Sequence, residues 1–264
     1  MSNPAEGYES YMVPVLFRPW AERLVQAASP RADERVLDVG CGTGIVARVV
    51  AERLGGSAEI AGVDLSPDML AVARATAARD GAAIEWHRSP AERLPFADGG
   101  FDLVLCQFAL MFFADRAAAL AEMRRVLTTR GRVLASAWLD LNRHPFYGTL
   151  HEVIRERLGV SALAQIFSLG DADELRSLAA GAGFGSIEIE SVSMTARFPN
   201  PDGFLAGEIE VDTAAIPELQ HLDAEARGAI VTAIAAEMRA PLAEATHGDR
   251  VVLPFHAHLV SARP

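Results

Sequence analysis

Short apolar runs and helical patterns alternate through the first half of the chain. The apolar runs are rich in Val, Ile and Leu, and they predict five strands at residues 35–39, 58–63, 83–87, 101–106 and 132–138. Between them, apolar residues recur at helical spacing and predict helices at 43–54, 66–79 and 115–127. Strands and helices in steady alternation are typical of βαβ units, in which a parallel sheet has helices on both faces.

The second half of the chain is less regular. Helical patterns cover 144–158 and 171–182, and strands are predicted at 186–197 and 251–262. The segment 199–245 is rich in Ala and Glu, and it is far longer than an ordinary loop of about 4–6 residues. We expect this segment to be mostly helical and to form a cap inserted before the last strand.

Charge and cysteine content narrow the class of protein. Lys plus Arg number 24 and Asp plus Glu number 35, which gives a formal net charge of -11. We expect no nucleic-acid partner, because affinity for nucleic acid rests largely on cations that neutralise phosphates. The chain has two cysteines, no apolar leader and no apolar stretch long enough to cross a bilayer, so a cytoplasmic protein without a membrane partner is expected. No His, Cys and Asp cluster has metal-ligand spacing, so we expect no metal.

The strongest chemical signal is the sequence VLDVGCGTG at residues 36–44. Three alternating glycines follow a buried strand and lead directly into a helix. Glycine permits a tight turn and the close approach of a ligand, and the helix offers free N–H groups and the positive end of its dipole. The alternative is a glycine-rich turn that binds nothing.

An acidic residue after the second predicted strand favours a ligand-binding turn over one that binds nothing. Asp64 follows Gly44 by twenty residues and ends the second predicted strand, where a carboxylate can accept hydrogen bonds from a ribose diol. Asp64 could instead cap the next helix, but Ser66 before Pro67 suits that role better. The sixth motif position holds Ile45 where a dinucleotide fingerprint has glycine. The spacing therefore favours a ligand without a pyrophosphate.

Four blocks together carry a family resemblance. Residues 36–44, 64–70 (DLSPDML), 91–96 (AERLPF) and 101–104 (FDLV) resemble successive motifs of the class I S-adenosylmethionine-dependent methyltransferases. Within that superfamily they resemble the small-molecule group that includes the ubiquinone and menaquinone methylases. The resemblance implies an α/β, doubly wound, Rossmann-like fold with a seven-stranded, mostly parallel sheet, an antiparallel last strand and a helical cap insertion. The implied domains are an N-terminal helical lid at 1–34, a methyltransferase core at 35–198 and 246–264, and a helical substrate cap at 199–245.

The resemblance also implies S-adenosylmethionine as cofactor and indicates which residues would contact its methionine part. The three glycines would border the methionine, Asp38 would lie close to its amino group, and the carbonyl of Gln107 would face its ammonium. The N-terminal segment 8–20 would fold over the cofactor, where Tyr11 or Arg18 could reach the carboxylate. The alternative for this segment is a helix packed on the edge of the sheet.

The nucleoside end is implied in the same way. Asp64 would bind the ribose hydroxyls, Leu65 or Met69 would pack on the adenine, and Ala91 and Glu92 would reach the adenine edge. Members of the family often have Asp two positions before the Ala-Glu pair, whereas this chain has Ser there. The expected cofactor-binding residues are Tyr11, Arg18, Asp38, Gly40, Cys41, Gly42, Gly44, Asp64, Leu65, Met69, Ala91, Glu92 and Gln107.

Methyl transfer needs an in-line approach to a methyl group on positive sulfur, so the protein mainly positions the reactants and excludes water. No catalytic residue is named, because a base is needed only for some acceptors. Each of four histidines can be a packed or surface residue as well as a base: His144, His151, His256 and His258. The residues expected to line an apolar, aromatic acceptor site, or else to belong to the ordinary core, are Met111, Phe112, Trp138, His144 and Phe146.

The sequence therefore predicts S-adenosylmethionine-dependent methyl transfer to an O, N or C atom of a small apolar or aromatic metabolite, by a monomer or homodimer. Two alternatives stay open: a quinone-ring C-methylase, and a regulatory module that binds the cofactor without transferase activity. A nicotinamide-dependent oxidoreductase is disfavoured by Ile45.

Overall fold

The structure is a computed structural model that describes residues 3–55, 58–161, 163–201, 203–205, 207–208 and 223–264. The chain divides into two compact units. Unit 1 comprises Met1–Ala137, Asp171–Val192 and Ala257–Pro264, and unit 2 comprises Trp138–Gly170 and Ser193–His256. The predicted division into lid, core and cap was drawn differently and stays a prediction, and part of the predicted cap, 209–222, lies outside the described residues.

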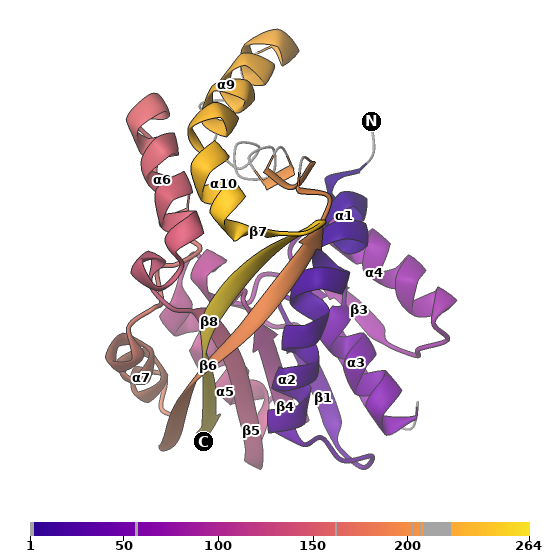
Figure 1. Ribbon diagram of the computed structural model, residues 1–264. Coiled ribbons are helices and arrows are strands. Elements are labelled where there is room, and N and C mark those ends of the chain that lie inside the picture. Colours follow the sequence, from indigo (N-terminus) through magenta and orange to yellow (C-terminus); the bar gives the residue numbers. More distant parts are fainter. Residues whose placement is uncertain (1–2, 56–57, 162, 202, 206, 209–222) are drawn as a thin grey trace. The chain divides into compact units, whose positions relative to one another are not determined.

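A mixed sheet organises the fold (Figure 1). Among the described residues it has eight strands, of which seven follow the order β3-β2-β1-β4-β5-β8-β6, while β7 pairs with β8. Strands β1 to β5 are parallel neighbours, and the C-terminal strands run antiparallel. The strands are β1 (Arg35–Val39), β2 (Glu59–Asp64), β3 (Glu85–Arg88), β4 (Phe101–Gln107), β5 (Leu127–Trp138), β6 (Ser186–Pro199), β7 (Thr246–His247) and β8 (Arg250–Arg263).

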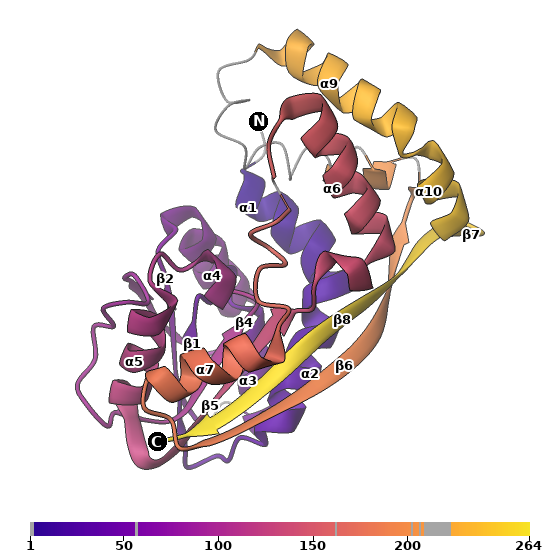
Figure 2. The same ribbon diagram turned by 90° about the vertical axis from the view of Figure 1, so that its left-hand side faces the viewer.

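Helices cover both faces of the sheet in unit 1. Leu134 of β5 belongs to an apolar core shared with α2 and α3, whereas its neighbours Val133 and Ala135 line a small apolar cavity together with residues of α5 and α7. Because successive side chains of a strand point to opposite faces, the two helix pairs lie on opposite sides. Figure 2 shows α5 beside α7. These helices are α2 (Arg18–Ala28), α3 (Ile45–Leu54), α4 (Pro67–Arg79), α5 (Arg116–Val126) and α7 (Ala172–Gly181).

The described N-terminal part of unit 1 is helical from Pro4 to Ala28, and the expected lid at 1–34 stays a prediction. A short helix α1 (Pro4–Gly7) leads into a π-helix, η1 (Tyr8–Phe17), which includes Pro14 and continues into α2. Val13 and Leu16 of η1 are buried, so the segment packs on the core.

Unit 2 is built around aromatic side chains. Helices of unit 2 include η3 (Leu141–Arg143), α6 (Pro145–Leu158), α9 (Ala224–Glu237) and α10 (Arg239–Ala245). Buried aromatic rings of unit 2 contact one another with centroids 4.8–6.4 Å apart. They are Trp138, Phe146, Tyr147, Phe167, Phe198, Phe204 and Phe255.

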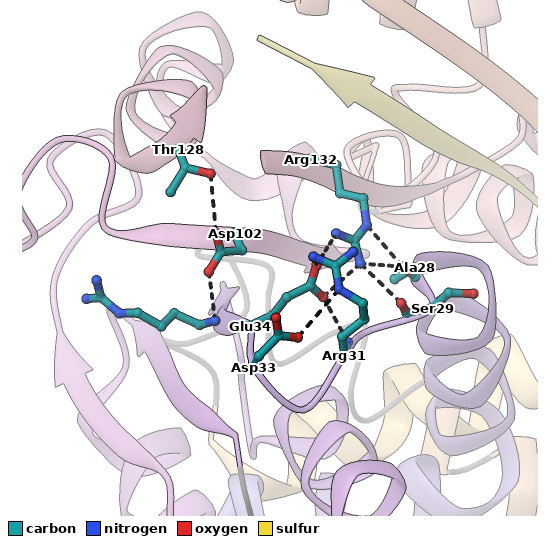
Figure 3. A network of polar contacts seen from close by, with 9 residues as sticks. Ala28, Ser29, Arg31, Asp33, Glu34, Asp102, Thr128 and Arg132 are labelled. Atoms are coloured by element: carbon teal, nitrogen blue, oxygen red, sulfur yellow. Dashed lines mark hydrogen bonds and ion pairs between the residues drawn. The ribbon is translucent and has the colours of Figure 1, made fainter. Parts of the chain in front are cut away.

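A network of polar contacts lies at the amino ends of the strands (Figure 3). The buried Glu34 carboxylate accepts from Arg132 Nη1 at 2.7 Å and from the backbone N–H of Arg31 at 2.9 Å. Arg132 Nη2 also donates to the carbonyl of Ala28, the last residue of α2, at 2.7 Å. The network therefore ties the end of α2 to β5, away from the carboxyl ends of the strands.

The expected fold class is confirmed, with two differences in detail. The eighth strand is β7, whose two residues pair with β8. Strand β5 begins at Leu127 rather than at residue 132, because Leu127 already pairs with Phe101 before a bulge in the ladder. In the part of the chain that the structure describes, no helix is long and apolar enough to cross a membrane.

Candidate functional site

The glycine turn joins β1 to α3 at the carboxyl edge of the sheet. Gly40, Gly42 and Gly44 all have positive φ, of 68°, 53° and 82°, a conformation that non-glycine residues seldom adopt. A Cβ on Gly40 would come within 2.4 Å of Ala109, and one on Gly44 within 2.3 Å of Trp86. A Cβ on Gly42 would have nothing within 4 Å. Two glycines therefore serve packing, and the middle one borders open space.

Two buried oxygens lie at the ends of adjacent strands. Asp38 is 1% exposed, and its Oδ2 accepts from the backbone N–H of Ala47 at 3.2 Å. Its Oδ1 is buried and, among the described residues, has no hydrogen-bond partner. The same is true of Gln107 Oε1, two positions beyond Leu105, the β4 residue that pairs with Asp38. Buried polar atoms are nearly always hydrogen-bonded, so two unmatched acceptors on adjacent strands indicate a place for a cationic donor.

The charge state of Asp38 is perturbed. Burial raises the pKa of Asp38 to about 7, the N–H of Ala47 opposes this shift, and the charge of Asp64 adds to it. A cation at Oδ1 would offset both the desolvation and the repulsion between the two carboxylates.

Asp64 ends β2 and organises its own loop. Its Oδ2 accepts from the backbone N–H of Gly42 at 2.8 Å, and its Oδ1 accepts from that of Ser66 at 2.8 Å. Each carboxylate oxygen can accept a second bond. The next residue, Leu65, is 61% exposed, whereas Met69 in the first turn of α4 is half-buried. Asp64 therefore braces the glycine turn beside an exposed apolar side chain.

The loop after β3 supplies the Ala-Glu pair. Ala91 is buried, and Glu92 is half-buried with its Oε1 accepting from the backbone N–H of Asp115 at 3.2 Å. Glu92 therefore connects this loop to the start of α5.

The N-terminal segment lies against the same edge. Gln107 Nε2 donates to the carbonyl of Phe17 at 3.1 Å, so the amide of Gln107 holds the segment while its oxygen stays unmatched. Burial raises the pKa of Tyr8, and the charges of Glu9, Asp64 and Asp38 raise it further, so the phenol lies within electrostatic range of both site carboxylates.

Arg18 and Tyr11 differ in their surroundings. Arg18 forms ion pairs with Glu22 at 3.1 Å and with Glu52 at 2.6 Å. Tyr11 is half-buried in η1. The expected contact of either residue with the cofactor carboxylate stays a prediction.

The expected acceptor residues fall in both units. Met111 in unit 1 is buried, and its neighbour Phe112, on the short helix η2 (Leu110–Phe112), is 54% exposed. Trp138 and Phe146 belong to the aromatic cluster of unit 2. Their roles toward an acceptor stay predictions.

Both ring nitrogens of His144 are engaged. Its Nε2 accepts from the backbone N–H of His256 at 3.0 Å, which leaves Nδ1–H to donate to the carbonyl of Asp140 at 3.2 Å. Burial lowers the pKa of His144 to about 4. This arrangement favours a packed, neutral histidine over a base. His256 and His258 face Ser193 and Ser191 through Nδ1, at 2.7 Å and 3.1 Å.

The comparisons with known proteins decide the family. Residues 36–131 match the family described as a methyltransferase domain. The ubiquinone/menaquinone biosynthesis C-methyltransferase UbiE of Laribacter hongkongensis is 31% identical over 192 residues, which cover 67% of this chain and 78% of that protein. The chain belongs to the class I S-adenosylmethionine-dependent methyltransferases.

Two further similarities show how far the likeness reaches. A demethylmenaquinone methyltransferase of Thermus thermophilus is 42% identical over 115 residues, which cover 44% of this chain and 52% of the relative. The chain thus spans about half the length of that methyltransferase. The solved structure of the YcgJ protein of Bacillus subtilis matches with a TM-score of 0.61 at 21% identity. The match covers 92% of this chain and 97% of YcgJ, and at this identity it shows a similar fold only.

The residues of the candidate site fit S-adenosylmethionine, the cofactor of the family. S-Adenosylmethionine carries an ammonium group, which matches the two unmatched acceptors Asp38 Oδ1 and Gln107 Oε1. The open space at Gly42 permits close approach of a ligand to the backbone, and the exposed Leu65 offers an apolar surface for adenine. Among the described residues no group of His, Cys, Asp and Glu could hold a metal ion.

Three residues near the candidate site were not expected from the sequence. Trp86 fills the space that Gly44 and Gly62 leave free, and the charges of Asp64 and Asp38 act on Tyr8. Phe108 has φ 49°, and its ring packs edge-on against Trp20 with centroids 5.5 Å apart. No sequence signal marks Phe108, because large side chains are not expected at positive φ.

Proposed function

We propose that this protein transfers a methyl group from S-adenosylmethionine to a small apolar or aromatic metabolite. The observation that supports the proposal most is the pair of buried, unmatched acceptors, Asp38 Oδ1 and Gln107 Oε1, beside the glycine turn. Neutral or cationic donors satisfy such a pair, and an anion does not.

The proposed work of the protein is binding and positioning. The cofactor, when bound, supplies an electrophilic methyl group on a positive sulfur. Asp38 and Gln107 would fix the ammonium, Asp64 would accept from the ribose hydroxyls, and Leu65 or Met69 would cover the adenine. Holding two reactants in line accounts for much of the rate that such a reaction needs, so no general base is required for a reactive acceptor.

The remaining assignments belong to the same proposal. Tyr11 or Arg18 would meet the cofactor carboxylate, and Ala91 and Glu92 the adenine edge. The acceptor would meet Met111, Phe112, Trp138, His144 and Phe146, within a cap at 199–245 and under a lid at 1–34. We further propose a cytoplasmic monomer or homodimer, in keeping with the free thiols of Cys41 and Cys106.

Calorimetric titration tests the cofactor. We expect micromolar binding of S-adenosylmethionine and no binding of NADH. Asp64→Ala should abolish the binding, and Asp98→Asn, a change at an 81% exposed carboxylate of the same unit, should leave it unchanged. Binding of NADH, or of neither compound, would overturn the proposal.

A quinone-ring C-methylase is a second candidate, favoured by the similarity to demethylmenaquinone methyltransferase. Transfer of labelled methyl from S-adenosylmethionine to a short-chain demethylmenaquinol and to simple phenols separates the two. Transfer to a ring carbon of the quinol alone favours the C-methylase, and transfer to phenol oxygen favours the broader proposal. Cofactor binding without any transfer would favour a regulatory module.

A further inference from the structure

A buried arginine lies close to the glycine turn and has no part in the proposed chemistry. Arg48 of α3 is 4% exposed, and its backbone N–H donates to the carbonyl of Gly44 at 3.0 Å. Its Nη2 contacts Glu9 Oε1 at 2.6 Å, and its Nη1 contacts Asp80 Oδ2 at 3.2 Å. A guanidinium is seldom buried without a specific role, because desolvation offsets much of the attraction to its partners.

The partner Glu9 belongs to a segment with an unusual backbone conformation. Glu9 lies in the first turn of η1, a π-helix of ten residues that contains Pro14. Long π-helices are rare, and π-helical turns occur often at functional sites. The tertiary contacts of η1 therefore hold it in place more than its own backbone does.

The end of η1 contacts the proposed cofactor site, and its start lies within electrostatic range of that site. At the start, the charges of Asp64 and Asp38 act on the buried phenol of Tyr8. At its end, the carbonyl of Phe17 accepts from the amide of Gln107, whose other atom is one of the two unmatched acceptors. A cofactor held by Asp38 and Gln107 would thus lie under η1.

We propose that Arg48 is a positioning residue that latches η1 over the cofactor and so limits the rate at which the cofactor leaves. The ion pair with Glu9 joins η1 to the helix that begins at the glycine turn, and Asp80 holds the guanidinium from the other side. This inference rests on the proposed function.

Glu9→Gln tests the latch, because it removes the charge on the η1 side and leaves Arg48 paired with Asp80. We expect S-adenosylhomocysteine to dissociate about tenfold faster, since breaking a buried charge pair acts mainly on the dissociation rate. Amide hydrogen exchange of Tyr8–Phe17 in the complex should accelerate by a similar factor. Arg48→Met serves as a second variant. In the double variant of Arg48→Met and Glu9→Gln, S-adenosylhomocysteine should dissociate no faster than in either single variant, because both changes break the same ion pair.

Two controls separate the latch from general loosening. Asp80→Asn removes the partner of Arg48 that lies outside η1, and Glu190→Gln removes an exposed ion pair with Arg23 of α2. Glu190→Gln should leave the dissociation rate and the exchange of η1 within about twofold of the parent. Asp80→Asn should accelerate both less than Glu9→Gln does, because it leaves the ion pair between Arg48 and Glu9 in place. An equal effect of Asp80→Asn and Glu9→Gln, or no effect of Glu9→Gln, overturns the latch while cofactor binding by the parent still supports the proposed function. Failure of the parent chain to bind the cofactor overturns both.

Discussion

The three glycines after β1 look alike in the sequence but differ in what surrounds them. Gly40 and Gly44 are required because side chains occupy the space of a Cβ, whereas Gly42 borders open space. The three residues share a positive φ, so any replacement carries backbone strain of about 1–2 kcal/mol. The steric surroundings therefore distinguish the two packing glycines from Gly42, the one proposed to face the ligand.

Gly42→Ala and Gly44→Ala should therefore fail in different ways. Gly42→Ala should unfold at slightly lower urea concentration, a loss of about 1–2 kcal/mol, and bind S-adenosylmethionine at least tenfold more weakly. Gly44→Ala would meet Trp86 and should lose roughly 2–5 kcal/mol of stability. Urea denaturation and calorimetric titration measure the two losses. Unchanged cofactor affinity in Gly42→Ala would contradict the assignment.

We expect Asp38 to make cofactor binding depend on pH. Burial raises the pKa of Asp38 to about 7, so in the free protein the carboxyl holds a proton increasingly as the pH falls below 7. A cationic ligand binds the ionised form, and its affinity should fall by up to tenfold for each pH unit between about pH 7 and pH 5. Titrations over this range check the slope. Asp38→Asn should bind weakly with no slope, and an equal slope in that variant would assign the proton to another group.

The residues of the candidate site can be predicted from the sequence more readily than the residues that pack around it. Asp38, Asp64 and Gln107 follow from the strand ends of a recognisable motif order. Tyr8 and Phe108 do not, because they meet the site through tertiary packing and through a backbone conformation that large residues rarely adopt.

At the scale of elements, the strand and helix order of unit 1 follows from hydrophobic periodicity, and the boundaries follow from contacts. The link Thr-Thr-Arg-Gly at 128–131 has the composition of a turn, but Leu127 already joins the ladder opposite Phe101. The π-helical form of η1 also depends on the core beneath it, since a helical period alone does not distinguish α from π.

The amino edge of the sheet should respond strongly to loss of one charge. Arg132→Met would leave the buried Glu34 carboxylate without its main partner, and we expect a loss of roughly 3–5 kcal/mol in the free energy of unfolding. Burial alone would raise the pKa of Glu34, but the hydrogen bonds from Arg132 and Arg31 and their charges lower it overall. The stabilisation is therefore present above the pKa of an unfolded glutamate, about 4.3, and is lost as the pH falls toward the lowered pKa.

Urea denaturation of Arg132→Met and of Glu34→Gln at pH 7 and pH 3.5 checks both statements. The difference in the free energy of unfolding between Glu34→Gln and the parent should be smaller at pH 3.5 than at pH 7. Arg31→Met is the matched control, since its guanidinium reaches the same carboxylate from an exposed position and should matter less. A constant difference would show that the charge of Glu34 is not what stabilises this edge.

At the scale of the whole molecule, the two units carry different buried acids. In unit 2, Tyr147 donates to Glu208 Oε2 at 3.0 Å. Burial raises the pKa of Glu208 to about 7, and the bond from Tyr147 offsets part of the rise. A raised pKa means that folding favours the protonated acid, so this group weakens the fold progressively as the pH rises from about 4.3 to about 7.

Glu208→Gln removes this titration and keeps an acceptor for Tyr147. We expect the variant to gain roughly 3 kcal/mol over the parent at pH 8 and about 1 kcal/mol at pH 5. Denaturation should be followed by hydrogen exchange of α6 as well as by a global probe, because two compact units need not unfold as one. Glu244→Gln, a change at an exposed position of the same unit, should gain nothing at either pH. A gain independent of pH would contradict the assignment.

The path of the chain through the two units has a consequence for descent. Both ends of the chain lie in unit 1, and unit 2 is made of two separate stretches, Trp138–Gly170 and Ser193–His256. A single recombination event that replaced one of these stretches would join part of unit 2 from another protein to the remaining part of the original unit 2. The region 36–131, which matches the methyltransferase family, lies before both stretches and would pass through such an exchange intact. Lineages of this kind should therefore keep a common first half while the second half diverges by gradual substitution in two places at once.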